Sequence, residues 1–307
     1  MSGADDRDSR APEASAGNRK FRRWFSPAFL MVTVRGRYGA IVVPQRGAFR
    51  LPRQTGVTDP ALRRLLAHAT PVGTAMGIFL IWEAGVRMFQ VPTYIAPAPS
   101  DVGRTLVEQW PLLMRNFWPT FYESIMGFLF GNMAAILIAV AFVHSRTVER
   151  AFFPIAVFVN TIPILAIAPI LVLIFGAGLT AKVVIAALIC FFPTLVNMVR
   201  GLQAVSPETL ELARILSASK SEVFWKIRLP SSLPFLFSAL KIAATTCVIG
   251  AIVGEWVGAN LGLGALIIDS TFNFRSSLLY ATVFLSSGLS VMLFALVTIA
   301  EKLVVRW

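Results

Sequence analysis

The polar stretch GLQAVSPETLELARILSASKSEVFWKIRLPSS, residues 201–232, lies between two long apolar segments, 181–200 and 233–256. Four further apolar segments bring the total to six, and each is near the roughly 20 residues that a helix needs to cross about 30 Å of hydrocarbon. In chain order the six are 70–90, 119–143, 151–175, 181–200, 233–256 and 279–301. The sequence therefore predicts an all-α, polytopic membrane protein with six transmembrane helices, bent where Pro163, Pro169 and Pro193 interrupt them.

The polar stretch itself has signals for two short helices. Ser206 can cap free amides, the proline that follows suits the first helical position, and Glu208 favours the positive end of the helix dipole. Apolar residues then recur at helical spacing with charged residues between them. We expect a bend near residues 217–221 and a second helix that stops before Pro230, because the residue before a proline disfavours the helical conformation.

Composition supports the membrane assignment. Hydrophobic residues make up 56% of the chain and charged residues 14%, with a mean hydropathy of +0.70, whereas an ordinary soluble domain carries about 25% charged residues. The net charge of +12 would suggest nucleic acid in a soluble protein. Here the basic residues gather in the N-terminal stretch and in the connecting loops, which is the distribution of the positive-inside rule. The lipid bilayer is therefore the expected partner, and nucleic acid is not.

Charge also predicts domain organisation and orientation. Residues 1–64 are rich in arginine, are broken by glycine and proline, and contain no apolar block of spanning length. They are predicted to be a basic, disordered cytoplasmic arm. Residues 65–307 then form the transmembrane domain, with 201–232 as its main polar loop. Basic residues flank the spans on the side of that loop, so both termini and the loop are expected in the cytoplasm.

Residues suited to catalysis or metal binding are sparse. Cys190 and Cys247 fall inside apolar runs without CxxC spacing, and His68 and His144 stand far apart, so no disulfide, metal site or catalytic residue is predicted. The chain also has no G-x-x-x-x-G-K-[ST] phosphate loop. A membrane-embedded enzyme would need a cluster of His, Asp or Cys near one face, and the sequence shows none.

Two motifs carry a resemblance to a known family. Glu211-Leu212-Ala213, followed by Ile227-Arg228-Leu229-Pro230, resembles the EAA motif of binding-protein-dependent ABC importer permeases: Glu-Ala-Ala, a Gly four residues after the second Ala, then Ile-x-Leu-Pro. Leu212 replaces the first alanine, and Ser217 stands where the family has glycine. Since serine does not adopt positive φ as freely as glycine, either the bend is less extreme here or some strain is accepted.

The resemblance covers roughly residues 71–307. The run Ile95-Ala96-Pro97-Ala98-Pro99-Ser100 looks like the family's entry to the core domain, and Gly254-Glu255-Trp256 with Gly262-Leu263-Gly264 looks like its late-span signature. Together they point to the nitrate, taurine and sulfonate branch. The resemblance implies a type I ABC importer permease fold in a bacterial inner membrane. It also implies a small solute of the sulfonate, taurine, nitrate or vitamin-precursor type.

The family's division of labour assigns partners and a coupling site. The loop would lodge in a cytoplasmic ABC ATPase that uses the ATP, so that this chain binds no cofactor and is not itself an enzyme. The other expected partners are a periplasmic or lipid-anchored solute-binding protein and a second permease copy in a homodimer. The residues expected to couple to the ATPase are Glu211, Leu212, Ala213, Leu216, Ser217, Ile227, Leu229 and Pro230.

Polar residues inside the apolar segments are candidates for the solute path, because an unpaired charge at mid-membrane costs at least a few kcal/mol. Glu255 matches the family's acidic residue near the outer end of the fifth span and is a candidate for the pathway or gate. Asn160 and Thr161 are uncharged groups that could line a cavity or join helices by hydrogen bonds.

The other charged residues have simpler explanations. Glu83 and Arg87 could pair at i and i+4, while Lys182 and Lys241 could snorkel from span ends.

The alternative function is an ion-gradient-driven secondary transporter. That class typically has internal halves with related hydropathy and ionisable residues at mid-membrane, and no such repeat is visible in the sequence.

Overall fold

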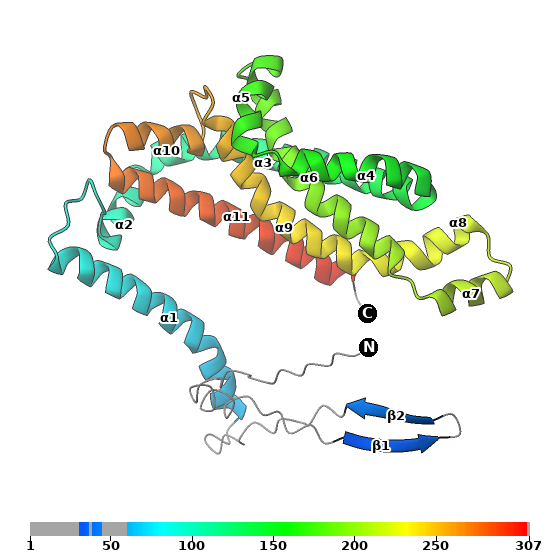
Figure 1. The fold of residues 1–307 in the computed structure, drawn as a ribbon. Coiled ribbons are helices and arrows are strands. Elements are labelled where there is room, and N and C mark those ends of the chain that lie inside the picture. Colours follow the sequence, from blue (N-terminus) through cyan, green and yellow to red (C-terminus); the bar gives the residue numbers. More distant parts are fainter. Residues whose placement is uncertain (1–30, 37–38, 45–59, 306–307) are drawn as a thin grey trace, which may run out of the picture. The chain divides into compact units, whose positions relative to one another are not determined.

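The computed structural model describes residues 31–36, 39–44 and 60–305, and the chain divides into two units, Met1–Thr70 and Pro71–Trp307 (Figure 1). In the first unit, β1 (Met31–Gly36) pairs antiparallel with β2 (Gly39–Pro44), with Val32 opposite Val43. β-Branched residues dominate both strands, which favours extended chain. The arm predicted at 1–64 therefore differs from the structure at these strands and at the first turns of α1.

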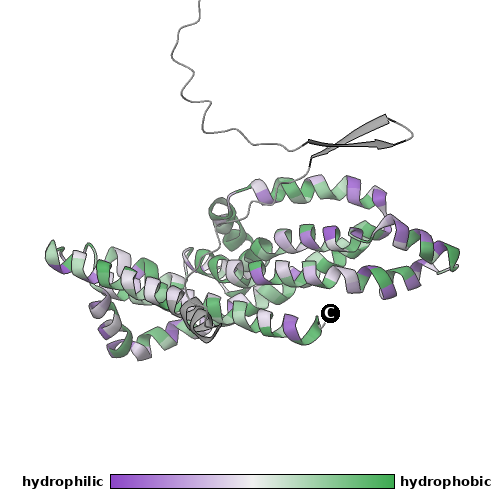
Figure 2. Cartoon of the chain, turned by 90° about the horizontal axis from the view of Figure 1, so that it is seen from below, coloured by the Kyte–Doolittle hydropathy of each residue, from purple (hydrophilic) through white to green (hydrophobic). Residues whose placement is uncertain are grey.

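The second unit is helical, and its first helix, α1, begins within the first unit. The helices are α1 (Pro60–Met88), α2 (Pro99–Glu108), α3 (Trp110–His144), α4 (Arg146–Thr161), α5 (Ile164–Phe175), α6 (Leu179–Gln203), α7 (Pro207–Ile215), α8 (Lys220–Val223), the π-helical turn η2 (Phe224–Arg228), α9 (Leu229–Glu255), α10 (Leu263–Phe272) and α11 (Ser276–Val304). Hydrophobic residues predominate along the long helices (Figure 2). The predicted all-α membrane fold is confirmed.

Four of the six predicted spans correspond to single apolar helices of spanning length in the described residues. By length and composition, four helices can cross a membrane: α3, α6, α11 and the continuous helix Lys220–Glu255. A fifth span is formed if α4 and α5, which are bent by 100°, count as one. The predicted segment 70–90 lies mostly on α1, which is helical but is not among the spanning helices found in the described residues.

Proline breaks the third predicted span instead of only kinking it. Ile162, the residue before Pro163, has φ −75° and ψ 125°, an extended conformation. The proline ring excludes the helical region for the residue that precedes it, so α4 ends at Thr161 and α5 restarts at Ile164. Pro169 is accommodated inside α5. The expectation of a kinked but continuous helix over 151–175 is therefore corrected to two helices.

Pro230 does not end the helix before it, contrary to the sequence-based expectation. The chain passes from α8 through η2 into α9, and the amide of Leu229 donates to the carbonyl of Phe224, five residues back. Pro230 has no amide hydrogen and its ring would crowd the carbonyl four residues earlier in an α-helix. The wider π turn relieves this crowding, so the helix continues from the loop into the span.

Small residues hold the centre of the bundle together. α6 packs between α3 and α9, and the green α6 crosses beside the yellow α9 in Figure 1. At Gly250 of α9, an added Cβ would lie 2.6 Å from the Cα of Ala186 in α6, and at Gly127 of α3 it would collide with the Cβ of the same alanine. Close backbone approach through small residues is the usual way in which helices pack inside a membrane.

Replacing Gly250 by alanine tests this packing. We expect Gly250→Ala to lower the free energy of unfolding by about 1–3 kcal/mol, because the new methyl group must push α9 away from α6. The matched control is Gly288→Ala in α11, where nothing lies within 4 Å of the added Cβ and where alanine gains up to about 1 kcal/mol of helix propensity. Thermal unfolding of both variants in the same detergent measures the difference; equal melting temperatures would contradict the close packing.

Candidate functional site

The loop 206–230 begins with a capped helix, as the sequence predicts. Ser206 accepts a hydrogen bond from the amide of Thr209 at 3.3 Å, and proline occupies the first turn of α7. Glu208 lies in the same turn, where its own backbone amide and then the Ser206 hydroxyl hold the pKa of its carboxyl below the ordinary value. α7 therefore has a fixed start at the end of α6.

The bend after α7 is strained, which decides between the two alternatives that the sequence left open, strain or a less extreme bend. Ser217 has φ +55°, the left-handed region. Its amide donates to the carbonyl of Arg214 and the next amide, that of Ala218, donates to Ala213, both at 2.9 Å. This is the Schellman pattern of helix ends, in which glycine is the usual residue. The bend is therefore as tight as a glycine would make it, at a cost of about 1–2 kcal/mol.

After the bend, α8 begins with a capping box formed by Ser219 and Glu222. The sequence contains this Ser-x-x-Glu pattern, but the capping box was not predicted from it. The amide of Glu222 donates to the Ser219 hydroxyl at 3.2 Å, and the amide of Ser219 donates to the Glu222 carboxylate at 3.0 Å. Lys226 pairs with the same carboxylate at 3.0 Å. These bonds fix the start of α8.

The residues expected to couple to the ATPase divide into two groups. On α7 and the bend, Glu211, Leu212, Leu216 and Ser217 are exposed, with Leu216 at 72%. Ala213 is buried, and Ile227, Leu229 and Pro230 are half-buried in the helix that leads into α9. Ile215, which the sequence did not single out, is 79% exposed on α7. Helices with capped N-termini thus present an exposed apolar surface beside an acidic residue.

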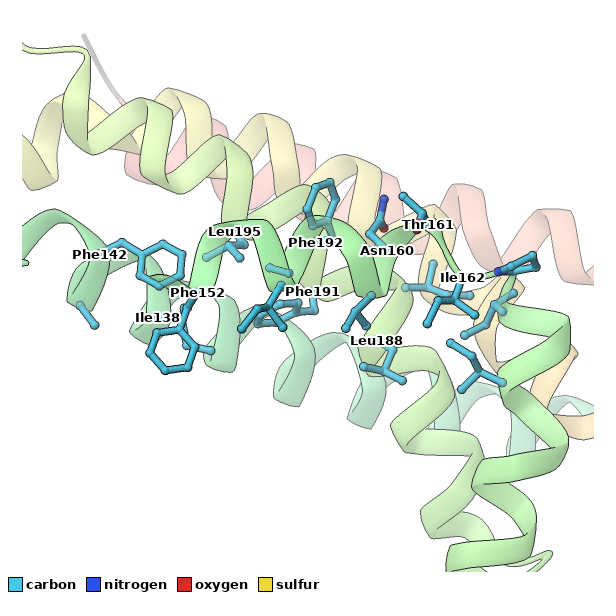
Figure 3. A pocket seen from close by; sticks show the side chains of 18 of the residues that line it. Ile138, Phe142, Phe152, Asn160, Thr161, Ile162, Leu188, Phe191, Phe192 and Leu195 are labelled. Atoms are coloured by element: carbon cyan, nitrogen blue, oxygen red, sulfur yellow. The ribbon is translucent and has the colours of Figure 1, made fainter. Parts of the chain in front are cut away.

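A cavity of about 740 Å³ lies along the broken span, lined by α3, α4, α5 and α6. Asn160 and Thr161, the last residues of α4, are on its wall together with aromatic side chains of α3, α4 and α6, as Figure 3 shows. The Thr161 hydroxyl donates to the carbonyl of Phe158 at 2.7 Å. The side-chain amide of Asn160 makes no hydrogen bond to another described residue. No charged residue lines this cavity.

Glu255 lies in a different environment from Asn160 and Thr161. It is 1% exposed, accepts from the Thr120 hydroxyl and from the amide of Gly264, both at 2.6 Å, and so joins α9 to α3 and α10. The same Thr120 hydroxyl accepts from the amide of Leu263 at 2.8 Å. The structure places Glu255 in this hydrogen-bonded cluster and not on the cavity wall.

The remaining intramembrane charges are paired. Lys182 of α6, for which snorkelling was expected, is buried and bonds Glu123 of α3 at 3.0 Å. Lys241 pairs with Glu301. The predicted pair of Glu83 and Arg87 is confirmed, and both also bond Ser100 at the start of α2.

Comparisons with known proteins give a family match and several relatives with similar sequences. Residues 131–306 match the family described as binding-protein-dependent transport system inner membrane component. The formylaminopyrimidine transport permease protein ThiX of Halalkalibacterium halodurans is 34% identical, over 75% of this chain and 92% of the relative. The riboflavin transport system permease protein RibX of Chloroflexus aurantiacus is 32% identical, over 76% and 88%.

A more distant relative and a solved structure complete the comparison. The aliphatic sulfonates transport permease protein SsuC of Escherichia coli, a putative assignment in its own description, is 24% identical over 80% of this chain and 94% of the relative. Among solved structures, the MetNI methionine ABC transporter in an inward-facing conformation aligns with a TM-score of 0.55 at 22% identity, over 65% of this chain and 97% of the matched chain. That likeness shows the fold.

Replacing Ser217 by glycine tests the strained bend. We expect Ser217→Gly to stabilise the loop by roughly 0.5–1 kcal/mol, because glycine adopts positive φ without the steric cost that serine bears. The control is Ala218→Gly at the next position, which does not have positive φ and so should lose stability. Hydrogen exchange of the loop amides reports the change. Faster exchange in Ser217→Gly than in the parent protein would contradict the strain.

Proposed function

This chain belongs to the binding-protein-dependent transport system inner membrane components, the permease subunits of ABC importers, and we propose that two copies of it work with a cytoplasmic ATPase and an external solute-binding protein. ATP is used by the ATPase, and this chain supplies the path and the mechanical connection. Orientation follows the basic residues: both termini and the loop 206–230 face the cytoplasm of a bacterial cell.

The observation that carries this proposal is the loop 206–230. Its exposed face carries Glu211 with Leu212, Ile215 and Leu216, a combination that a partner groove can cover with both apolar contact and a charge interaction. α7 follows α6 directly, and η2 continues into α9 without a break. Because α6 and α9 are packed together at the centre of the bundle, a displacement of α7 by the ATPase would move the spans.

The transport cycle then needs two arrangements of the same bundle. ATP-driven closure of the ATPase dimer would draw the two loops together and favour one arrangement, and release of nucleotide would favour the other. The capping bonds at Ser206 and Ser219 keep the loop from absorbing this movement as local bending.

The solute path runs along the break between α4 and α5. Backbone that leaves the helical conformation at membrane depth is tolerated where it is buried in protein or lines a water-filled cavity, and a cavity of about 740 Å³ lies at this break. That volume falls within the roughly 300–1,000 Å³ of small-molecule sites. Asn160 and Thr161 supply the polar groups of this path, whereas Glu255 serves to hold α9, α10 and α3 together.

The chemistry of the cavity favours an uncharged aromatic solute. Its wall has aromatic rings, among them Phe152, Phe191 and Phe192, and the free amide of Asn160. A sulfonate or nitrate would lose its hydration here without a basic side chain to replace it. The permeases for formylaminopyrimidine and riboflavin, at 34% and 32% identity, are more similar than the sulfonate permease at 24%. We assign the solute to the nitrogen-heterocycle class.

Purification of the tagged chain from cells that also express the neighbouring transport genes tests the assembly. The proposal expects an ATPase to be retained in a stoichiometric complex. Retention of no ATPase under conditions in which the permease stays folded would contradict it.

Reversing the charge of Glu211 tests the loop. We expect Glu211→Lys to leave the protein in the membrane but to lower ATP-dependent uptake at least about tenfold, as the loss of a charge-assisted contact predicts. The control is Glu108→Lys, the same change at an exposed residue of α2 outside the loop. Uptake into vesicles with the ATPase and binding protein measures both. Equal uptake by the two variants would remove the loop from coupling.

Competition between solutes tests the heterocycle assignment. We expect an uncharged aminopyrimidine to be taken up in preference to taurine, and Asn160→Asp to reduce that uptake about tenfold, because a carboxylate cannot donate the hydrogen bond that the side-chain amide of Asn160 offers to the solute. Asn260→Asp, at an exposed residue outside this cavity, is the control. ATP-dependent uptake of taurine with none of the aminopyrimidine would keep the importer and refute the solute class.

A further inference from the structure

A second cavity, of about 680 Å³, lies where the end of α3 meets the start of α4, with Gln203 of α6, Leu210 of α7 and Arg228 of η2 completing its wall. The start of α4 contributes Arg146, Glu149 and Arg150. This cavity is distinct from the apolar one along the broken span, and the proposed transport path does not use it.

The cavity has an excess of positive charge. Three arginines face one carboxylate, that of Glu149, which accepts a hydrogen bond from the Gln203 amide at 3.0 Å. In the part of the chain that the structure describes, Arg146, Arg150 and Arg228 form no ion pair with any acidic side chain. α4 also begins here, with Ser145 as its cap, so the positive end of its dipole adds to the field. Three arginines on the wall of one cavity are suited to a phosphate, which guanidinium groups can bind through paired hydrogen bonds.

The surroundings of the arginines are apolar. Val143, Phe153 and Leu210 line the same cavity. Farther along α4, Val157 and Phe158, which do not line the apolar cavity, are 38% and 68% exposed. An anion in this cavity is therefore next to a helix with exposed apolar side chains outside the proposed solute path. A ligand with an anionic head and hydrocarbon chains matches both features, whereas a soluble phosphate would use only the first.

The cavity also lies between the end of one span and the start of the next, and this inference rests on the proposed orientation, which puts these ends at the cytoplasmic surface of the membrane, where phospholipid head groups are found. α3 is a spanning helix that ends at His144, and α4 begins the next span at Arg146. Basic pockets between the cytoplasmic ends of membrane helices are suited to anionic lipid head groups.

We propose that the cavity formed by Arg146, Arg150 and Arg228 binds the phosphate of an anionic phospholipid, whose chains lie along α4. Because Leu210 is on α7, the bound lipid contacts the helix that carries Glu211. The lipid therefore stabilises the position of the loop, and the composition of the bilayer sets how firmly the loop is held.

Native mass spectrometry of the purified full chain tests this proposal. The protein is equilibrated with vesicles of equal parts phosphatidylglycerol and phosphatidylcholine, and the retained lipid is identified. We expect selective retention of phosphatidylglycerol by the parent protein. Each of Arg146→Gln, Arg150→Gln and Arg228→Gln should reduce it roughly fivefold, the effect of one arginine at a lipid surface.

Two control variants keep the test falsifiable. Arg200→Gln removes the same charge from an exposed residue near the end of α6 that does not line the cavity, and it should retain lipid as the parent does. A triple change of Arg146, Arg150 and Arg228 to lysine keeps the charge and should retain part of the lipid, which separates loss of binding from loss of folding.

Three results would overturn the proposal. The first is equal retention of phosphatidylglycerol by the glutamine variants and by Arg200→Gln. The second is displacement of the lipid by inorganic phosphate with no preference between the two phospholipids, which would assign the site to a soluble anion. The third is a glutamine variant that keeps its lipid but no longer retains the ATPase, which would assign the arginines to protein contact.

Discussion

The close approach of α6 to α3 and α9 is the constraint on which the rest of the structure depends. Gly127 and Gly250 contact the same residue, Ala186, from two sides, so the three helices are held at backbone distance with no room for a larger side chain. α6 enters the loop 206–230 and α9 leaves it. A polar loop between two loosely packed helices would move alone, whereas this loop is connected at both ends to helices of the closely packed set.

Polar side chains within the spans form bonds between these packed helices. Glu123 pairs with Lys182, and Glu255 is bonded to Thr120 and Gly264, so these side chains join helices. What remains for the cavity at the α4–α5 break is apolar surface with one free amide. Charge is concentrated instead at the other cavity, where three arginines lie beside the loop. The two cavities thus have opposite chemistry, one suited to an uncharged solute and the other to an anion.

Most of the architecture could be predicted from apolar segments alone, because length and hydropathy decide which helices can lie in lipid. The helix start at Ser206 followed from local capping rules in the same way. The break at Pro163 was harder to predict from the sequence. Pro169 and Pro193 disfavour a helix in the same way, yet both remain inside helices. Whether a proline bends or breaks a helix depends on neighbours that a single sequence does not identify.

Two further features depend on tertiary contacts. The sequence made Glu255 a candidate for the solute path because an intramembrane carboxylate is costly. Only the fold brings Thr120, 135 residues away in the sequence, close enough to donate a hydrogen bond to this carboxylate. The π turn before Pro230 likewise arises because the helix must continue into a span. Ser217 is the reverse case: the sequence posed the alternatives, strain or a wider bend, and the backbone angle of +55° decided for strain.

In the proposed cycle, ATP drives movement of this bundle through the loop 206–230. Solute uptake tests this coupling in vesicles that contain the permease, its ATPase and its binding protein, measured with ATP, without ATP, and without the ATPase under an imposed ion gradient. We expect uptake only when ATP and the ATPase are both present. Uptake that persists without the ATPase and follows the ion gradient would contradict it.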